Sequence, residues 1–245
     1  MKTSSAPLRS RAGFTLVEVM ISLTIVVLVL SLALSTFLFG LKAMYRDMER
    51  LQTNASLRSF TAQISKETID ASEFYVFPLY TALDGNVDLT NDVSTLTADS
   101  FDTFLAYGDC LVLITRVSVD DTTANIRQIR IYYRQVTNSN NDGPIRYWES
   151  TDYGSSGTST SLTALLNAIN LNATPAYSGS RVLAKIARGR RIGSTSNYYP
   201  IFSTESATTT PTNENVSINV EFLNGSSINN LLSSSSFNYT ISPRR

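Results

Sequence analysis

Residues 9–41 read RSRAGFTLVEVMISLTIVVLVLSLALSTFLFGL, and this stretch determines how the whole chain is organised. From Val19 to Leu41 there are 23 residues without a formal charge, a proline or a histidine. As a helix this run is about 34 Å long, enough to cross a bilayer core of about 30 Å. Soluble domains rarely contain such a run, so the sequence predicts a transmembrane helix.

The charges before this run indicate its orientation. Lys2, Arg9 and Arg11 precede it, and Glu18 is the only acid among the first eighteen residues. By the positive-inside rule, the N-terminus stays in the cytoplasm and everything after Leu41 is exported.

A secretory signal peptide is the first alternative, because it also has a basic start and an apolar stretch. Ala33-Leu34-Ser35 is a passable cleavage site for a signal peptidase. However, the apolar run continues past that site, and Glu18 stands at its head, where a signal peptide gains nothing from an acid. No cysteine follows the run, which excludes a lipoprotein signal.

Residues 9–20, RSRAGFTLVEVM, resemble the cleavage and methylation segment of type IV prepilins and pseudopilins. In that family a short basic leader ends in glycine, and a membrane aspartic peptidase cuts after it. The new N-terminal residue, usually phenylalanine, is N-methylated, and a glutamate stands fifth in the mature chain. The resemblance assigns these positions to Gly13, Phe14 and Glu18.

The resemblance implies a structural subunit, a minor pilin or pseudopilin, rather than an enzyme. Its fold class would be α+β, with a long N-terminal transmembrane and amphipathic helix packed on an antiparallel β-sheet head. The implied partners are the prepilin peptidase and N-methyltransferase, other pilin or pseudopilin subunits, an inner-membrane assembly platform and membrane lipid. No catalytic residue, metal or cofactor is expected, and neutral net charge without a basic stripe gives no indication of nucleic acid.

Glu18 has two compatible interpretations. Thr15-Leu16-Val17-Glu18 fits the capping box, and an acid in the first turn also favours the helix dipole. In the second interpretation, the carboxylate pairs with the ammonium of Phe14 in an adjacent subunit, as the resemblance suggests. Such a pair would offset the cost of a charge at the edge of hydrocarbon.

Composition excludes several kinds of chemistry. The chain has no histidine, which removes His-based acid–base catalysis and His metal ligation. Its one cysteine, Cys110, cannot form an intramolecular disulfide or build a thiolate zinc site. Cys110 opens the apolar run Cys110–Ile114, so we expect a small buried strand residue.

The helix is expected to run on from Phe14 to Ser72, because no proline interrupts it. Apolar residues recur beyond the membrane at three- and four-residue spacing, which favours packing on the protein's own core. The domain organisation predicted from this is a leader at 1–13, a transmembrane helix at 14–41, an amphipathic continuation at 42–72 and a β-rich head at 73–245. The stripe consists of Leu41, Met44, Tyr45, Met48, Leu51, Ala55, Leu57, Phe60 and Ile64.

Strand patterns fill the head. Residues 109–119 form an apolar run, residues 126–136 alternate, and Asn141-Asp142-Gly143-Pro144 is a turn before a short strand at 145–149, which together predict an antiparallel meander. A short helix capped near Ser161 and further strands at 182–187, 216–222 and 237–241 are also expected. The Ser/Thr/Asn-rich stretches 204–215 and 225–236 are expected to be exposed loops.

Three weaker features leave alternatives open. Asp84–Asp88 vaguely resembles the start of a calcium loop but lacks its glycine and closing glutamate, so a solvated turn is favoured. Arg188–Arg191 is a small basic loop, for which a solvated loop is favoured over a phosphate-binding or DNA-binding site. The head could instead belong to an anchored exported binding protein, which an exposed aromatic patch around Tyr132, Tyr147 and Trp148 would support, or to a carboxylate-based enzyme, which a close carboxylate pair in a cleft would support.

Overall fold

The computed structural model describes most of the chain after the leader. The described residues are 13–83, 105–118, 123–136, 142–169, 180–189, 199–205, 215–225 and 231–242. One long helix, α1 (Leu16–Ile69), is followed by a β-rich head. The chain divides into two compact units, one ending at Met48 and the other beginning at Glu49, so α1 contributes to both.

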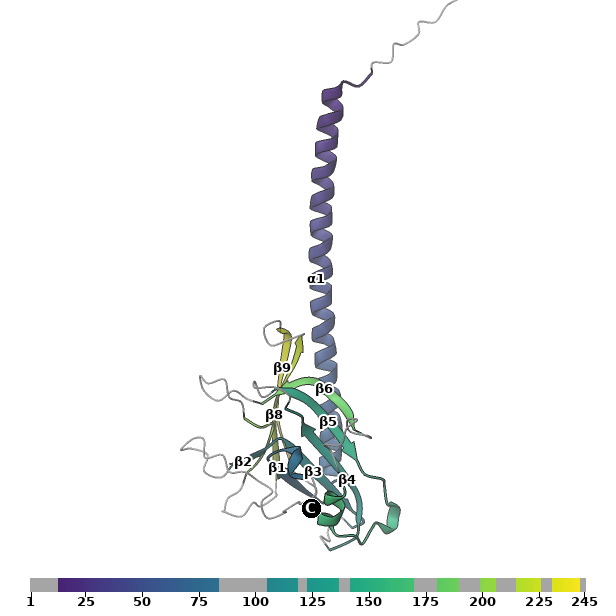
Figure 1. Cartoon of the computed structure of the whole chain (residues 1–245), viewed down its shortest axis with the longest axis vertical. Coiled ribbons are helices and arrows are strands. Elements are labelled where there is room, and N and C mark those ends of the chain that lie inside the picture. Colours follow the sequence, from purple (N-terminus) through teal and green to yellow (C-terminus); the bar gives the residue numbers. More distant parts are fainter. Residues whose placement is uncertain are drawn as a thin grey trace, which may run out of the picture. The chain divides into compact units, whose positions relative to one another are not determined.

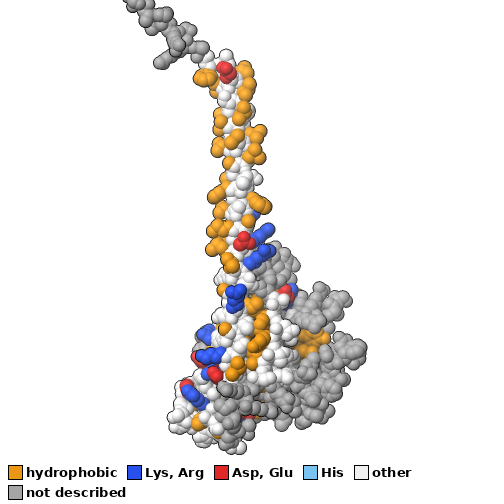
Figure 2. Space-filling model, turned by 180° about the vertical axis from the view of Figure 1, so that it is seen from behind, with side chains coloured by type: hydrophobic (Ala, Val, Ile, Leu, Met, Phe, Trp, Pro, Cys, Tyr) orange, Lys and Arg blue, Asp and Glu red, His pale blue; other side chains and the backbone are white. Residues whose placement is uncertain are grey.

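The first part of α1 is long and apolar enough to cross a membrane by length and composition. Its apolar side chains are exposed in the isolated chain, and Figure 2 shows those that lie on one face of the helix. The expectation that the apolar stripe packs on the protein's own core is wrong for its upper part, because Met44, Tyr45, Met48 and Leu51 are each more than half exposed. The stripe becomes buried only from Thr53 onward, at Phe60 and Ile64.

An antiparallel sheet forms the head, and nine of its strands are described (Figure 1). They run in the order β1-β3-β4-β5-β6-β8-β7-β2, with β9 paired to β8. The predicted meander is confirmed, because β3 pairs with β4 and β4 with β5. The strands are β1 (Glu73–Phe77), β2 (Leu105–Gly108), β3 (Cys110–Arg116), β4 (Ile126–Arg134), β5 (Gly143–Glu149), β6 (Arg181–Arg188), β7 (Phe202–Glu205), β8 (Val216–Gly225) and β9 (Leu231–Ile241).

Two apolar cores lie on opposite faces of this sheet. In one, Phe60 and Ile64 of α1 pack with residues such as Tyr132 of β4 and Phe222 of β8. The other core is closed by the short helix α2 (Leu162–Asn167) and by the 3-10 turn η1 (Tyr80–Leu83). The predicted cap of α2 is confirmed, since the Ser161 hydroxyl accepts a hydrogen bond from the Ala164 amide at 3.3 Å.

The alternation of β4 is confirmed, but both of its faces are buried. Ile129, Ile131 and Tyr133 point into the core under α2, whereas Tyr132 points into the core under α1. An alternating strand usually keeps one wet face. Here the helix covers the face that alternation alone would leave in water, so its polar side chains must find partners inside the protein.

Arg134 shows how such a partner is found. Its guanidinium donates two hydrogen bonds to Asp109, at 2.9 and 2.6 Å, and both side chains are nearly inaccessible. Asp109 also accepts a hydrogen bond from the amide of Ile201 at 3.0 Å. Burial raises the pKa of the Asp109 carboxyl, and the charge of Arg134 opposes that shift. The pair therefore joins β4, the β2–β3 connection and the approach to β7.

Three strands escaped sequence analysis, and two loop assignments were partly wrong. The expected exposed loop at 204–215 begins inside β7, where Thr204 is buried, and residues 206–214 lie outside the described part of the chain. β1, β2 and β7 are only four or five residues long, too short for alternation to be distinguished from chance. The segment at 231–236, which the sequence assigned to a loop, is part of β9. Its serines have little strand propensity of their own, and pairing along the whole of β8 places them in the sheet.

The buried pair can be tested against an exposed pair on the same strand. We expect Arg134→Met to destabilise the head by about 3–5 kcal/mol, because it leaves the Asp109 carboxylate buried without its counter-charge. Arg127 of β4 makes a similar two-bond contact with Asp152 at 3.2 Å, but both side chains are about half exposed. Arg127→Met should change stability little.

The measurement is denaturant unfolding of the full chain in detergent, followed by fluorescence of Trp148, the single tryptophan. Equal losses of stability in the two variants would contradict this assignment of the buried pair.

Candidate functional site

Gly13 and Phe14 lie in non-helical backbone just before α1. A Cβ placed on Gly13 would meet no atom within 4 Å, so nothing in the folded chain requires glycine there. Phe14 is 87% exposed. A non-helical, exposed glycine–aromatic junction is accessible to a peptidase. Since the folded chain itself does not need glycine at position 13, recognition by another molecule could be the reason for it.

Thr15 and Glu18 form the predicted capping box. The Thr15 amide and hydroxyl both donate to Oε2 of Glu18 at 3.0 Å, and the Glu18 amide donates to the Thr15 hydroxyl at 3.3 Å. These contacts satisfy amides that the start of a helix leaves without partners. The local role of Glu18 in starting α1 is therefore confirmed.

The same geometry leaves part of the carboxylate available. Both contacts from Thr15 fall on Oε2, and Oε1 accepts no hydrogen bond within the described part of the chain. A carboxylate offers about four acceptor positions, so capping one oxygen does not exhaust it. Glu18 can cap its own helix and still accept a donor from another molecule.

Four of the five hydroxyl side chains inside the apolar run donate hydrogen bonds within α1. Ser22 donates to the Glu18 carbonyl at 2.7 Å, and Thr36 donates to the Leu32 carbonyl at 2.9 Å. Thr24 and Ser31 make equivalent bonds of 2.8 Å to carbonyls three residues earlier. Because a hydroxyl without a partner is costly in an apolar medium, these bonds allow α1 to sit in hydrocarbon despite its serines and threonines.

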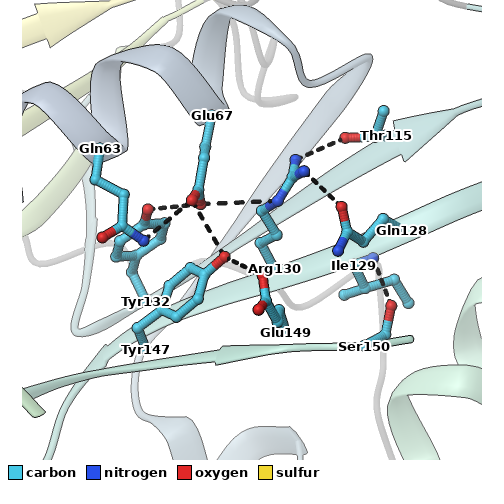
Figure 3. Close-up of polar contacts among 10 residues, drawn as sticks. All are labelled: Gln63, Glu67, Thr115, Gln128, Ile129, Arg130, Tyr132, Tyr147, Glu149 and Ser150. Carbon is cyan, nitrogen blue, oxygen red and sulfur yellow. Dashed lines mark hydrogen bonds and ion pairs between the residues drawn. The ribbon is translucent and has the colours of Figure 1, made fainter. Parts of the chain in front are cut away.

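A polar cluster centred on Glu67 docks the C-terminal part of α1 on the sheet (Figure 3). Tyr132 donates to one carboxylate oxygen at 2.6 Å, and the Tyr147 hydroxyl lies 3.1 Å from the other. Gln63, one turn earlier on α1, donates to that second oxygen at 3.0 Å. The Arg130 guanidinium lies 3.9 Å from the first. Glu67 thus joins the helix to β4 and β5.

The two tyrosines keep their protons in this cluster. Burial, reinforced by the nearby Glu67 carboxylate, raises the pKa of Tyr132 well above its ordinary value. Burial and the hydrogen bond to Glu149 raise the pKa of Tyr147 likewise. The Tyr147 hydroxyl lies 2.7 Å from Glu149, closer than it lies to Glu67. Its single proton is therefore held mainly by Glu149, and Tyr132 is the stronger donor to Glu67.

Sequence analysis missed this cluster, although a signal was present. Glu67 stands three residues after the buried Ile64 and seven after Phe60, on the same face of the helix. An acid in that stripe predicts a polar partner across the interface. Which partner it meets depends on β4 and β5, and the sequence does not place those strands beside the helix.

The tested alternatives for the head lose support. Tyr132 and Tyr147 are buried, and Trp148 packs partly against the core under α2, so these rings are not an exposed aromatic patch. Glu67 and Glu149 both contact Tyr147, but Glu67 is occupied by donors from the protein itself. This arrangement serves to fix the helix on the sheet.

The structure tests some of the remaining predicted features, and the others lie outside the described residues. Cys110 is fully buried at the start of β3, as expected, and burial raises the pKa of its thiol. Arg188 at the end of β6 is paired with Glu221 at 2.7 Å rather than free for a ligand. Arg190, Arg191 and the possible calcium loop at 84–88 lie outside the described residues.

Comparison with known proteins agrees with the N-terminal geometry. Residues 8–34 match the family model described as the prokaryotic N-terminal methylation motif. Neither the curated proteins nor the solved structures gave a match to the chain. The match is confined to the junction, the capping box and the first part of α1.

The chain therefore carries the signature of type IV prepilins and pseudopilins on an α+β fold, with one candidate membrane span among the described residues. This supports a pilin-like precursor. The motif implies processing by a prepilin peptidase and assembly with other pilin subunits.

The docking cluster makes a testable prediction. In Glu67→Gln the side chain keeps one acceptor oxygen for Tyr132, but its amide faces the donating amide of Gln63, and Arg130 loses its counter-charge. We expect a loss of about 1–3 kcal/mol in unfolding free energy, the usual cost of an unsatisfied buried partner. Asp70→Asn, on an exposed position one turn later, is the matched control and should have little effect.

Unfolding of the full chain in detergent, followed by Trp148 fluorescence, measures both variants. A Glu67→Gln protein as stable as the wild type would show that the cluster does not hold α1 to the sheet.

Proposed function

We propose that this chain is a minor pilin or pseudopilin, a structural subunit that is cleaved after Gly13, N-methylated at Phe14 and assembled into a type IV pilus-like fibre or a secretion pseudopilus. The observation that carries the proposal is the matched motif, with Gly13, Phe14 and Glu18 in place ahead of an apolar helix exposed on all sides.

Cleavage at Gly13 has a clear physical consequence. Hydrolysis of the Gly13–Phe14 peptide bond removes Lys2, Arg9 and Arg11 with the leader but keeps the apolar helix. A signal peptidase would do the reverse. The mature subunit starts with an amine at Phe14, which methylation leaves cationic, next to the capped first turn of α1. Its apolar side chains need lipid before assembly and sister helices afterwards.

Glu18 supplies the second step, assembly. A carboxylate carried into hydrocarbon costs on the order of 2–3 kcal/mol on insertion scales. An ammonium at Phe14 of the neighbouring subunit would offset that cost, and Oε1 of Glu18 is open to receive it. The charge selects a register in which each new N-terminus lies beside an existing Glu18.

The proposed setting follows from the same features. The subunit sits in the cytoplasmic membrane as a single-pass protein, with its N-terminus in the cytoplasm and its head exported. There it meets the peptidase and N-methyltransferase, membrane lipid, an inner-membrane assembly platform and other pilin or pseudopilin subunits.

Cleavage is tested by co-expressing the full chain with a prepilin peptidase and measuring the mature N-terminus by mass spectrometry. We expect a product that begins with N-methylated Phe14. Gly13→Val should accumulate as uncut precursor, because its side chain obstructs the peptidase, while head stability is unchanged because the folded chain has open space there. A wild-type N-terminus near Thr36 would instead identify a signal peptide.

The role of Glu18 is tested by separating its charge from its cap. Glu18→Gln can still cap the helix but carries no charge, whereas Thr15→Ala removes the capping hydroxyl and keeps the charge. We expect both variants to be cleaved normally, Glu18→Gln and Glu18→Ala to assemble poorly, and Thr15→Ala to assemble nearly as well as wild type.

The readout is the amount of subunit recovered in sheared fibres relative to the membrane fraction. If Thr15→Ala fails and Glu18→Gln assembles, the carboxylate acts only through its own helix.

A further inference from the structure

The side of α1 that faces away from the sheet carries a regular seam. From Leu51 to Ile69, exposed or half-buried positions recur at alternating spacings of four and three residues, which is the repeat of helices that pack on one another. Phe60 and Ile64, which pack on the sheet, stand on the other side of the helix. The seam consists of Leu51, Ala55, Arg58, Ala62, Ser65 and Ile69.

This seam is suited to contact with another helix. Leu51 is 69% exposed and Ile69 is 45% exposed, so large apolar side chains stand at both of its ends. Ala55 and Ala62 are exposed between them, and their small side chains leave room for those of a neighbouring helix. No helix in the described part of the chain covers the seam, because α2 closes the core on the far side of the sheet.

Arg58 is the one charged residue in the seam. Its side chain is exposed, and it forms no hydrogen bond or ion pair with any residue that the structure describes. A charge between packed helices is costly unless the partner supplies the opposite charge. Arg58 therefore restricts which helix can dock. Other arginines of the head already have carboxylate partners, namely Arg116, Arg127, Arg130, Arg134 and Arg188.

The register of a neighbouring helix follows from the proposed function. If Phe14 of one subunit lies beside Glu18 of the next, the two helices are displaced by four residues, or about 6 Å. They point the same way, because each subunit is anchored by its N-terminal helix with its head exported. In a neighbour of the same sequence, Arg58 would then lie level with Ala62 on one side and with Asn54 on the other.

A second copy of the chain supplies no counter-charge at those two positions. The exposed charges within four residues of them are Arg50, Arg58 and Lys66, and all three are cationic. Glu67 is the only acid of α1 between Arg50 and its C-terminal end, and it is bonded to Tyr132 on the docked face. Two copies packed through this seam would therefore bring like charges together.

We propose that Arg58 selects the partner of this seam: the neighbour is the N-terminal helix of a different pilin-like subunit that carries an aspartate or glutamate level with Arg58. The inference rests on the proposed function, from which it takes the shared membrane anchor and the four-residue register. A carboxylate at that level forms an ion pair with the guanidinium between the helices, where reduced contact with water strengthens it. The same charge disfavours a second copy, which gives the seam its specificity.

The first test identifies the neighbour through a cysteine placed in the seam. Cys110 is fully buried and gives a clean background. Ala62→Cys in the full chain is labelled with a short photoreactive group in membranes of the host that makes the chain, and the crosslinked products are identified by mass spectrometry. We expect a protein of different sequence that has the same N-terminal motif and an acid level with Arg58. Ala164→Cys, at an exposed position on α2, should not give this product.

A crosslinked dimer of the chain, a neighbour without an acid at that level, or no product at all overturns the proposal. The N-terminus of the crosslinked chain is read from the same spectra. A chain that begins at Phe14 and is crosslinked to its own copy refutes only the choice of partner, whereas an uncut chain refutes the proposed function.

The second test supplies the missing acid on the chain itself. Two differently tagged copies of the full chain are co-expressed and purified through one tag in detergent. An Ala62→Glu copy should retain about threefold more wild type than a wild-type copy does, because it places a carboxylate level with Arg58. Ala62→Lys is the matched control and should give no gain. Arg58→Glu in the other copy should abolish the gain from Ala62→Glu.

Trp148 unfolding curves check that these variants keep the fold, as expected for substitutions at exposed positions. Equal recovery of wild type with the Ala62→Glu and Ala62→Lys copies would show that Arg58 does not choose the partner, and the proposal would be wrong.

Discussion

The head depends on how the C-terminal part of α1 is held against the sheet. Phe60 and Ile64 fill one core, and Glu67 is bonded to Tyr132 of β4 and approached by Tyr147 of β5. The apolar contacts provide most of the stabilisation, since burial of large side chains outweighs single hydrogen bonds. The polar contacts add direction, because a carboxylate held by two hydroxyls fixes the helix against sliding on its apolar face.

Because only its C-terminal part is docked on the sheet, the two parts of α1 differ in burial and polarity. From Thr53 to its C-terminal end, α1 has a buried face and an exposed face, as expected of a helix packed on a sheet. Between Val19 and Leu41 its side chains are uncharged, mostly apolar and exposed on every side, which suits lipid or the interior of a fibre. The capping box and the internally bonded hydroxyls prepare this upper part for such surroundings, because they leave little unsatisfied polarity along the apolar run.

The edges of the sheet differ in how well they are protected. The Asp109–Arg134 pair and the close approach of Gly108 to Phe77 bring the two ends of the strand order together. β9 is added outside that arrangement and has a free outer edge among the described strands.

The sequence by itself determined the features that depend on neighbours along the chain. The apolar run, the capping box at Thr15 and Glu18, the junction at Gly13 and the cap at Ser161 are all readable because their partners lie within four residues. The alternation of β4 was equally local, and it predicted correctly which side chains share a face.

Only the tertiary structure decided what each face meets. Tyr132, on the face of β4 that could have been wet, is buried by α1, and Arg134 is buried against Asp109, 25 positions earlier. β1, β2 and β7 are too short to be recognised alone, and the serine run of β9 is a strand because β8 pairs with it. These contacts join residues that are far apart in the chain, and a local pattern fixes what a residue can do but not which distant residue it will face.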